Sequence, residues 1–87
     1  MSASKAIQDR VYQWAVGKNF TAPYGVLLSE QMSKAGRKFR SVTFGHARTL
    51  DCQVCIYGST FILIRSSRHG DQLFRSESDM QAFLDTL

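Results

Sequence analysis

Apolar residues near the N-terminus recur at the spacing of an amphipathic helix. Ser4 can serve as the N-cap, and Gly17 is a typical helix stop. The apolar positions between them fall at i, i+4, i+7 and i+8, and they are Ile7, Val11, Trp14 and Ala15. This period predicts a first helix with one buried side.

A second stripe at helical spacing extends from Thr21 to Gly36. Pro23 stands in what would be the first turn, where proline is well tolerated, whereas Gly25 weakens the pattern. The stripe consists of Tyr24, Leu27, Leu28, Met32 and Ala35. Because the connection between the two stripes is short, we expect the two helices to form an N-terminal helical hairpin.

Beyond Gly36 the pattern changes to alternation and short apolar runs, which are typical of strands. The pair Gly58–Ser59 fits a two-residue type II′ turn, and residues 68–71 predict a longer turn. The strands are expected over residues 39–46, 50–57, 60–66 and 72–75. Strands joined by short turns predict an antiparallel meander of three or four strands.

Alternation also assigns the strand side chains to the two faces of the sheet. One face would hold Leu50, Cys52, Val54 and Ile56. Residues 61–64 are apolar at every position, which is typical of a central strand covered on both sides.

The end of the chain predicts a short closing helix. Ser76 and Asp79 resemble a capping box with Asp in place of Glu. The apolar positions that follow are Met80, Phe83, Leu84 and Leu87. Residues 1–87 are therefore expected to form a single small α+β domain in the order α-α-β-β-β-β-α: a helical hairpin, a meander and a C-terminal helix.

Length and composition bound the class of protein. At 87 residues, 44% of them hydrophobic, the chain can build one core but not two domains. Its longest apolar run is far shorter than the ~20 residues of a membrane helix, so no membrane partner is expected. The N-terminus lacks the apolar segment of a secretory signal, and the cysteines are few, so a cytoplasmic location is expected. The oligomeric state is left open.

The net charge of +4 is unevenly distributed along the chain. Residues 34–75 hold eight basic and two acidic residues, a surplus that attracts polyanions. The candidate binding residues are Lys34, Arg37, Lys38, Arg40, Arg48, Arg65 and Arg68. An exposed Phe20, Tyr24 or Tyr57 would add a stacking surface.

From this surplus we expect a small non-enzymatic binding module for a polyanionic partner, with nucleic acid first. The alternative is a docking or inhibitor module that acts on a larger acidic protein, because a cationic surface attracts either partner. The chain contains no recognised catalytic or cofactor motif, so a binding module is favoured over an enzyme and no cofactor is expected.

The cysteines and histidines are the remaining candidates for chemistry. Cys52 and Cys55 stand within an expected strand, an odd spacing that places them on opposite faces. A zinc site would need two more ligands, so we expect Cys52 to be buried in a structural role and no metal to be bound. His46 and His69 could act as base and acid in RNA cleavage if the fold brings them together. A small toxin-like ribonuclease is therefore the second alternative.

The expected element order is loosely similar to two known families. In double-stranded-RNA-binding domains the last helix presents basic residues, whereas this chain has Glu77 and Asp79 there. A helical hairpin followed by a sheet and a helix is also similar to ribosome-dependent ribonuclease toxins, which usually carry an additional N-terminal strand. Neither resemblance rests on a specific motif, so no family is assigned.

Overall fold

The computed structural model describes residues 3–18, 26–46, 49–58 and 61–87. Helix α1 (Ala3–Gly17) comes first and helix α2 (Glu77–Leu84) comes last. Between them lie five strands: β1 (Leu27–Met32), β2 (Lys38–His46), β3 (Thr49–Tyr57), β4 (Phe61–Ser66) and β5 (Gly70–Phe74). The strands are hydrogen-bonded in chain order, and each is antiparallel to its neighbours.

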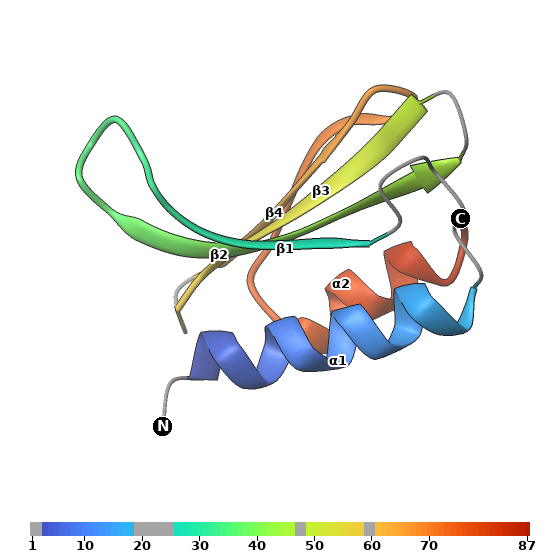
Figure 1. Ribbon diagram of the computed structural model, residues 1–87, viewed down its shortest axis with the longest axis horizontal. Coiled ribbons are helices and arrows are strands. Elements are labelled where there is room, and N and C mark those ends of the chain that lie inside the picture. The colour runs from blue at the N-terminus through green and yellow to red at the C-terminus, as the bar shows by residue number, and fades with distance from the viewer. Residues whose placement is uncertain (1–2, 19–25, 47–48, 59–60) are drawn as a thin grey trace.

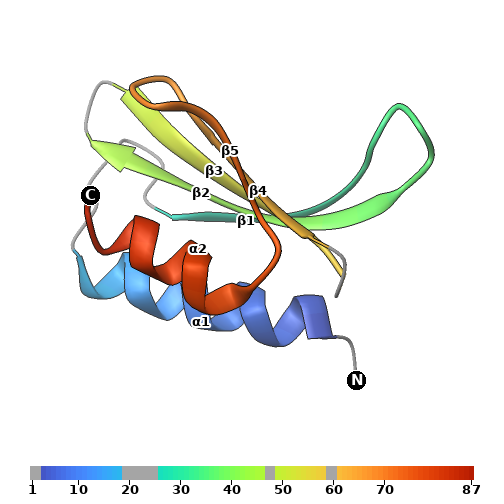
Figure 2. The ribbon, with the colours of Figure 1, turned by 180° about the vertical axis from the view of Figure 1, so that it is seen from behind.

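Both helices pack on one side of the sheet, so the molecule has two layers (Figure 1). The view from behind shows α1 and α2 together beneath the strands, with no described segment over the opposite face (Figure 2). The expected α+β class and the antiparallel meander are confirmed. The sheet has five strands, however, where the sequence predicts three or four.

The additional strand, β1, lies within the segment that the second stripe predicts to be helical. Residues 27–32 are extended and pair with β2 along their whole length, so the helical hairpin is wrong for these residues. Residues 21–25, where the second helix would begin, lie outside the described part of the chain. The stripe does not reach the core, because its members Leu27, Leu28 and Met32 are exposed. The strand conformation of this segment is therefore determined by hydrogen bonding to β2, and not by the burial of one side of a helix.

The loops between the first four strands also differ from expectation. Gly36 closes the β1–β2 turn with a φ of 78°, in the left-handed region that glycine adopts without strain. Across this turn the backbone N–H of Ser33 donates to the carbonyl of Arg37 at 2.8 Å. Tyr57 pairs with Phe61, so three residues separate β3 and β4 where the sequence predicts a two-residue turn.

Helix α1 contacts the sheet through its predicted apolar side and through one polar side chain. The fully buried residues of this side are Val11 and Ala15. The helix already includes Ser4, which is therefore not its N-cap. The buried side-chain amide of Gln8 donates to the backbone carbonyls of Ser29 and Ser41, at 3.2 and 3.1 Å. These bonds hold α1 against β1 and β2 while satisfying a buried polar group.

Helix α2 begins at its predicted cap. The hydroxyl of Ser76 accepts a hydrogen bond from the backbone N–H of Asp79 at 3.2 Å. The predicted apolar side is confirmed in part: Met80 and Leu84 are fully buried, Phe83 is half-buried and Leu87 is exposed. The cap thus starts the helix where its apolar side can meet the sheet.

An ion pair joins the two helices. The guanidinium of Arg10 in α1 donates two hydrogen bonds to the carboxylate of Glu77 in α2, at 2.6 and 2.7 Å. These bonds lower the pKa of Glu77 below its usual value. The contribution of the pair to stability is therefore present above the pKa of an unfolded glutamate, and it is lost in acid as Glu77 takes up a proton.

The core lies between the helices and one face of the sheet. The buried hydrophobic strand residues on this face are Val42, Phe44, Cys52, Val54, Ile56, Ile62 and Ile64. The shared face predicted for these residues of β3 is thereby confirmed for Cys52, Val54 and Ile56, while the side chain of Leu50 lies outside the described part. Phe61 and Leu63 of β4 lie on the other face and are half-buried. The prediction that residues 61–64 are covered on both sides is wrong, because the two helices cover one face.

We expect Leu84→Ala to lower the free energy of unfolding by about 2–5 kcal/mol, because it removes a fully buried side chain and leaves a cavity. The matched control is Leu87→Ala, which truncates a side chain that is 37% exposed and should cost far less. Urea denaturation followed by circular dichroism measures both. A loss of less than about 1 kcal/mol for Leu84→Ala would contradict the docking of α2.

Candidate functional site

The face of the sheet opposite the helices, called the uncovered face below, carries three rows of side chains that cross the strands. Residues directly opposite each other in antiparallel strands share a face, so the pairing registers define the rows. The aromatic row is Gln31, Phe39, Tyr57 and Phe61; the middle row is Ser29, Ser41, Cys55, Leu63 and Leu73; the third row is Leu27, Thr43, Gln53, Arg65 and Asp71.

The rings of the aromatic row stack on one another. The ring centroids of Phe39 and Tyr57 are 4.8 Å apart, and those of Tyr57 and Phe61 are 4.5 Å apart, with interplanar angles of 29° and 20°. All three side chains are half-buried. The guanidinium of Arg37 lies 5.8 Å from the centroid of Phe61, within cation–π range. One end of the uncovered face therefore combines a partly exposed aromatic stack with a cation.

The middle row is shallow because its central side chains are small. Ser41 and Cys55 are 0% and 2% exposed. The hydroxyls of Ser29 and Ser41 are hydrogen-bonded, and Ser29 also accepts from the amide of Gln31 at 2.7 Å. Burial raises the pKa of the Cys55 thiol from 9.0 to about 11. This thiol is protonated at neutral pH and is a poor nucleophile.

The structure separates the seven cations that the sequence predicts as binding residues. Arg65 lies in the third row of the uncovered face, and Arg37 reaches this face at Phe61. Lys34 belongs to the β1–β2 turn, which bends away from the helices toward the uncovered side (Figure 1). Arg68 lies in the turn between β4 and β5, at the opposite end of the sheet. Arg48 lies outside the described residues.

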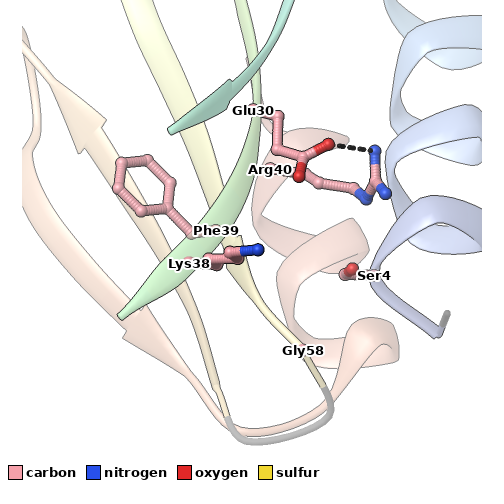
Figure 3. Close-up of a pocket in the computed structure, with 6 residues that line it drawn as sticks. All are labelled: Ser4, Glu30, Lys38, Phe39, Arg40 and Gly58. Carbon is pink, nitrogen blue, oxygen red and sulfur yellow. Dashed lines mark ion pairs between the residues drawn. The ribbon is translucent and has the colours of Figure 1, made fainter. Parts of the chain in front are cut away.

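The other two predicted cations, Lys38 and Arg40, lie on the helix side of β2. They border a cleft of about 260 Å³ between the start of α1 and the ends of β1 and β2 (Figure 3). The lining residues are Ser4, Glu30, Lys38, Phe39, Arg40 and Gly58. Arg40 forms an ion pair with Glu30 at 3.3 Å, so its charge is already balanced within the cleft. The cleft is therefore a weaker candidate for an anion than the uncovered face.

Charge is distributed unequally between the two layers. In the described part of the sheet and its turns, residues 26–75 with gaps, there are seven basic residues and three acidic ones, Glu30, Asp51 and Asp71. The two helices and the C-terminal residues after them carry three cations and four carboxylates. The sheet layer is thus the positive side of the molecule, and a polyanion approaching it meets a favourable field.

In the part of the chain that the structure describes, the two cysteines and His69 are not brought together at one site. Cys52 faces the helices and Cys55 lies on the uncovered face, as their spacing predicts. Within the described ranges, no three residues of the types His, Cys, Asp and Glu are grouped closely enough to hold a metal ion. The ring of His69 packs edge-on against Phe83, with centroids 5.8 Å apart. The side chain of His46 is outside the description, so the convergence of the two histidines stays a prediction.

Sequence reasoning identified one ring of the aromatic row and missed the row itself. Tyr57 is named above as a candidate for stacking, whereas Phe20 and Tyr24 lie outside the described residues. The signal that could have revealed Phe39 and Phe61 is their position: like Tyr57, each lies at or next to the end of a strand, and the three strand ends are at the same end of the meander. Using it requires the pairing register, which the sequence alone does not provide.

Comparisons with protein-family models, with curated proteins and with solved structures found no match to this chain. Neither described helix is long and apolar enough to span a bilayer. The function is therefore inferred from the geometry and charge of the uncovered face.

Native Cys55 should react slowly with iodoacetamide. A pKa of about 11 in place of 9.0 lowers the thiolate fraction near neutral pH roughly 100-fold, and burial adds a steric barrier. Alkylation of the Cys52→Ala variant, in which Cys55 is the single thiol, measures this rate by mass spectrometry. Unfolding in urea should restore the ordinary rate. Rapid alkylation of the folded variant would contradict a buried, protonated Cys55.

Proposed function

We propose that this protein is a non-enzymatic module that binds nucleic acid on the uncovered face of its sheet. The observation that carries the proposal is the coincidence, on one face, of cations and aromatic rings. Arg37 and Arg65 supply donors for phosphates, and the aromatic row supplies apolar surface beside them. Nucleic acids offer both chemistries in one chain, since phosphates alternate with bases.

Self-association through the same face is less favourable. Two copies packed with their uncovered faces together would bring Arg37 and Arg65 of each copy into one interface. Asp71 is the single carboxylate that the three described rows provide to offset them. Burying surplus like charges costs free energy, whereas a polyanion neutralises them.

Removing the two cations of the uncovered face should weaken binding to nucleic acid and flatten its dependence on salt. The test variant is Arg37→Gln/Arg65→Gln. Each lost phosphate contact should reduce the slope of log affinity against log salt by about 0.7–0.9, so the double variant should lose about 1.5. Fluorescence anisotropy with labelled oligonucleotides, repeated over a salt series, measures the slope.

The matched control is Lys5→Gln/Lys18→Gln, which removes the same charge from α1 and the residue after it. It should leave the slope almost unchanged, because these side chains lie in the helix layer. Equal losses in both variants would show that net charge alone matters and would contradict a site on the uncovered face. If the unmodified protein binds no nucleic acid even at low salt, the acidic-protein alternative replaces the proposal.

A further inference from the structure

We infer that the uncovered face takes single-stranded nucleic acid, with bases stacking on the aromatic row. This inference rests on the proposed function and names its substrate class. It adds a role for Phe39, Tyr57 and Phe61, which phosphate binding alone does not require.

The spacing of the rings shows how a base could join them. Adjacent strands lie about 4.8 Å apart, and the ring centroids repeat at 4.8 and 4.5 Å, so each ring stands beside its neighbour across the strands. The row is therefore a stack whose members face one another and whose two ends are Phe39 and Phe61. A base is a flat ring of similar size, and it can continue such a stack at the Phe39 end, whereas at the Phe61 end it would take the place of the Arg37 guanidinium.

The neighbours of both ends suit a base. Gln31 pairs with Phe39 in the register, and its planar amide is exposed. At the other end, the planar guanidinium of Arg37 lies 5.8 Å from the centroid of Phe61. Amide and guanidinium groups hydrogen-bond to the edges of bases, and the guanidinium can also contact the attached phosphate.

The rest of the face offers a path for the strand. From Phe61, β4 runs four residues to Arg65, a distance of about 13 Å at the usual rise of a strand. Between them on β4 lies half-buried Leu63, and beside it on β3 and β2 lies the shallow part of the middle row, where Cys55 and Ser41 do not project into solvent. A strand whose base stacks at the aromatic row can therefore cross the middle row and place a further phosphate near Arg65.

The shape of this surface favours a single strand over a duplex. In a duplex the bases stack on one another and their faces are not available. Five strands also give the sheet a width of about 19 Å, which exceeds the roughly 12 Å of the major groove, so the face as a whole cannot enter a groove. Only unpaired nucleotides can present both a free base face and a phosphate to this surface.

Three ligands separate base stacking from phosphate binding: a mixed-sequence DNA strand of about 12 nucleotides, an abasic strand of the same length, and the corresponding duplex. The unmodified protein should bind the mixed strand at least about fivefold more tightly than the abasic strand, the lower limit for the loss of one stacked base. It should also prefer the mixed strand to the duplex.

The variant Phe39→Leu/Phe61→Leu should abolish the preference for the mixed strand over the abasic strand while leaving the salt slope unchanged. Leucine keeps these positions apolar but removes the rings. Leu28→Ala, which truncates an exposed apolar residue on the helix side of β1, is the control and should retain the preference. If the double variant does not fold, the comparison of ligands on the unmodified protein remains decisive.

Equal affinity for the mixed and abasic strands, or tighter binding of the duplex, would overturn the inference. If the Arg37→Gln/Arg65→Gln variant still loses affinity in that case, the result supports nucleic-acid binding and contradicts base stacking. If none of the three ligands binds, the result contradicts both the proposed function and this inference.

Discussion

The structure depends on a core that is built on one face of the sheet. Two helices fit side by side over five strands, and they bury the residues of β2, β3 and β4 that point toward them, with Val42, Val54 and Ile64 aligned across the sheet. The chain has no further described helix to cover the opposite face. For so short a chain this arrangement provides one adequate core, and it leaves a broad surface of the sheet in contact with solvent.

That surface departs from what an uncovered sheet face usually carries, which is mainly polar side chains. Phe39, Tyr57, Phe61 and Leu63 lie there half-buried, and Leu73 is 54% exposed. Apolar residues in such a position are typical of binding surfaces. The distribution of charge indicates which partner is suited to this surface, because the described sheet layer carries seven basic and three acidic residues, whereas the helix layer carries three basic and four acidic ones. The same two-layer fold thus separates the parts that stabilise the protein from the parts that we propose bind nucleic acid.

Much of this arrangement could be predicted from the sequence, and the failures have physical causes. The first helix, the closing helix with its Ser76 cap, and the strands after Gly36 follow from local pattern and are confirmed closely. The segment of β1 was not predictable in this way, since its leucines satisfy a helical period and its strand form depends on pairing with β2. The sequence indicated which types of residue form the candidate site, but it did not indicate where in the fold they lie. Arg40 and Arg65 look alike in the sequence, and the register places each opposite a carboxylate, Glu30 and Asp71, but Arg40 lies on the helix side of the sheet and Arg65 on the uncovered face.

The most direct test of the account uses methyl groups on adjacent residues of β4 that lie on opposite faces of the sheet. Leu63 lies on the uncovered face, whereas Ile62 and Ile64 are buried against the helices. In a methyl NMR titration with a single-stranded DNA of about 12 nucleotides, the signals of Leu63 and Leu73 should shift progressively. Those of Ile62 and Ile64 should move little. Shifts confined to the isoleucines or to α1 and α2, or no shifts at all, would contradict the assignment of the uncovered face as the binding surface.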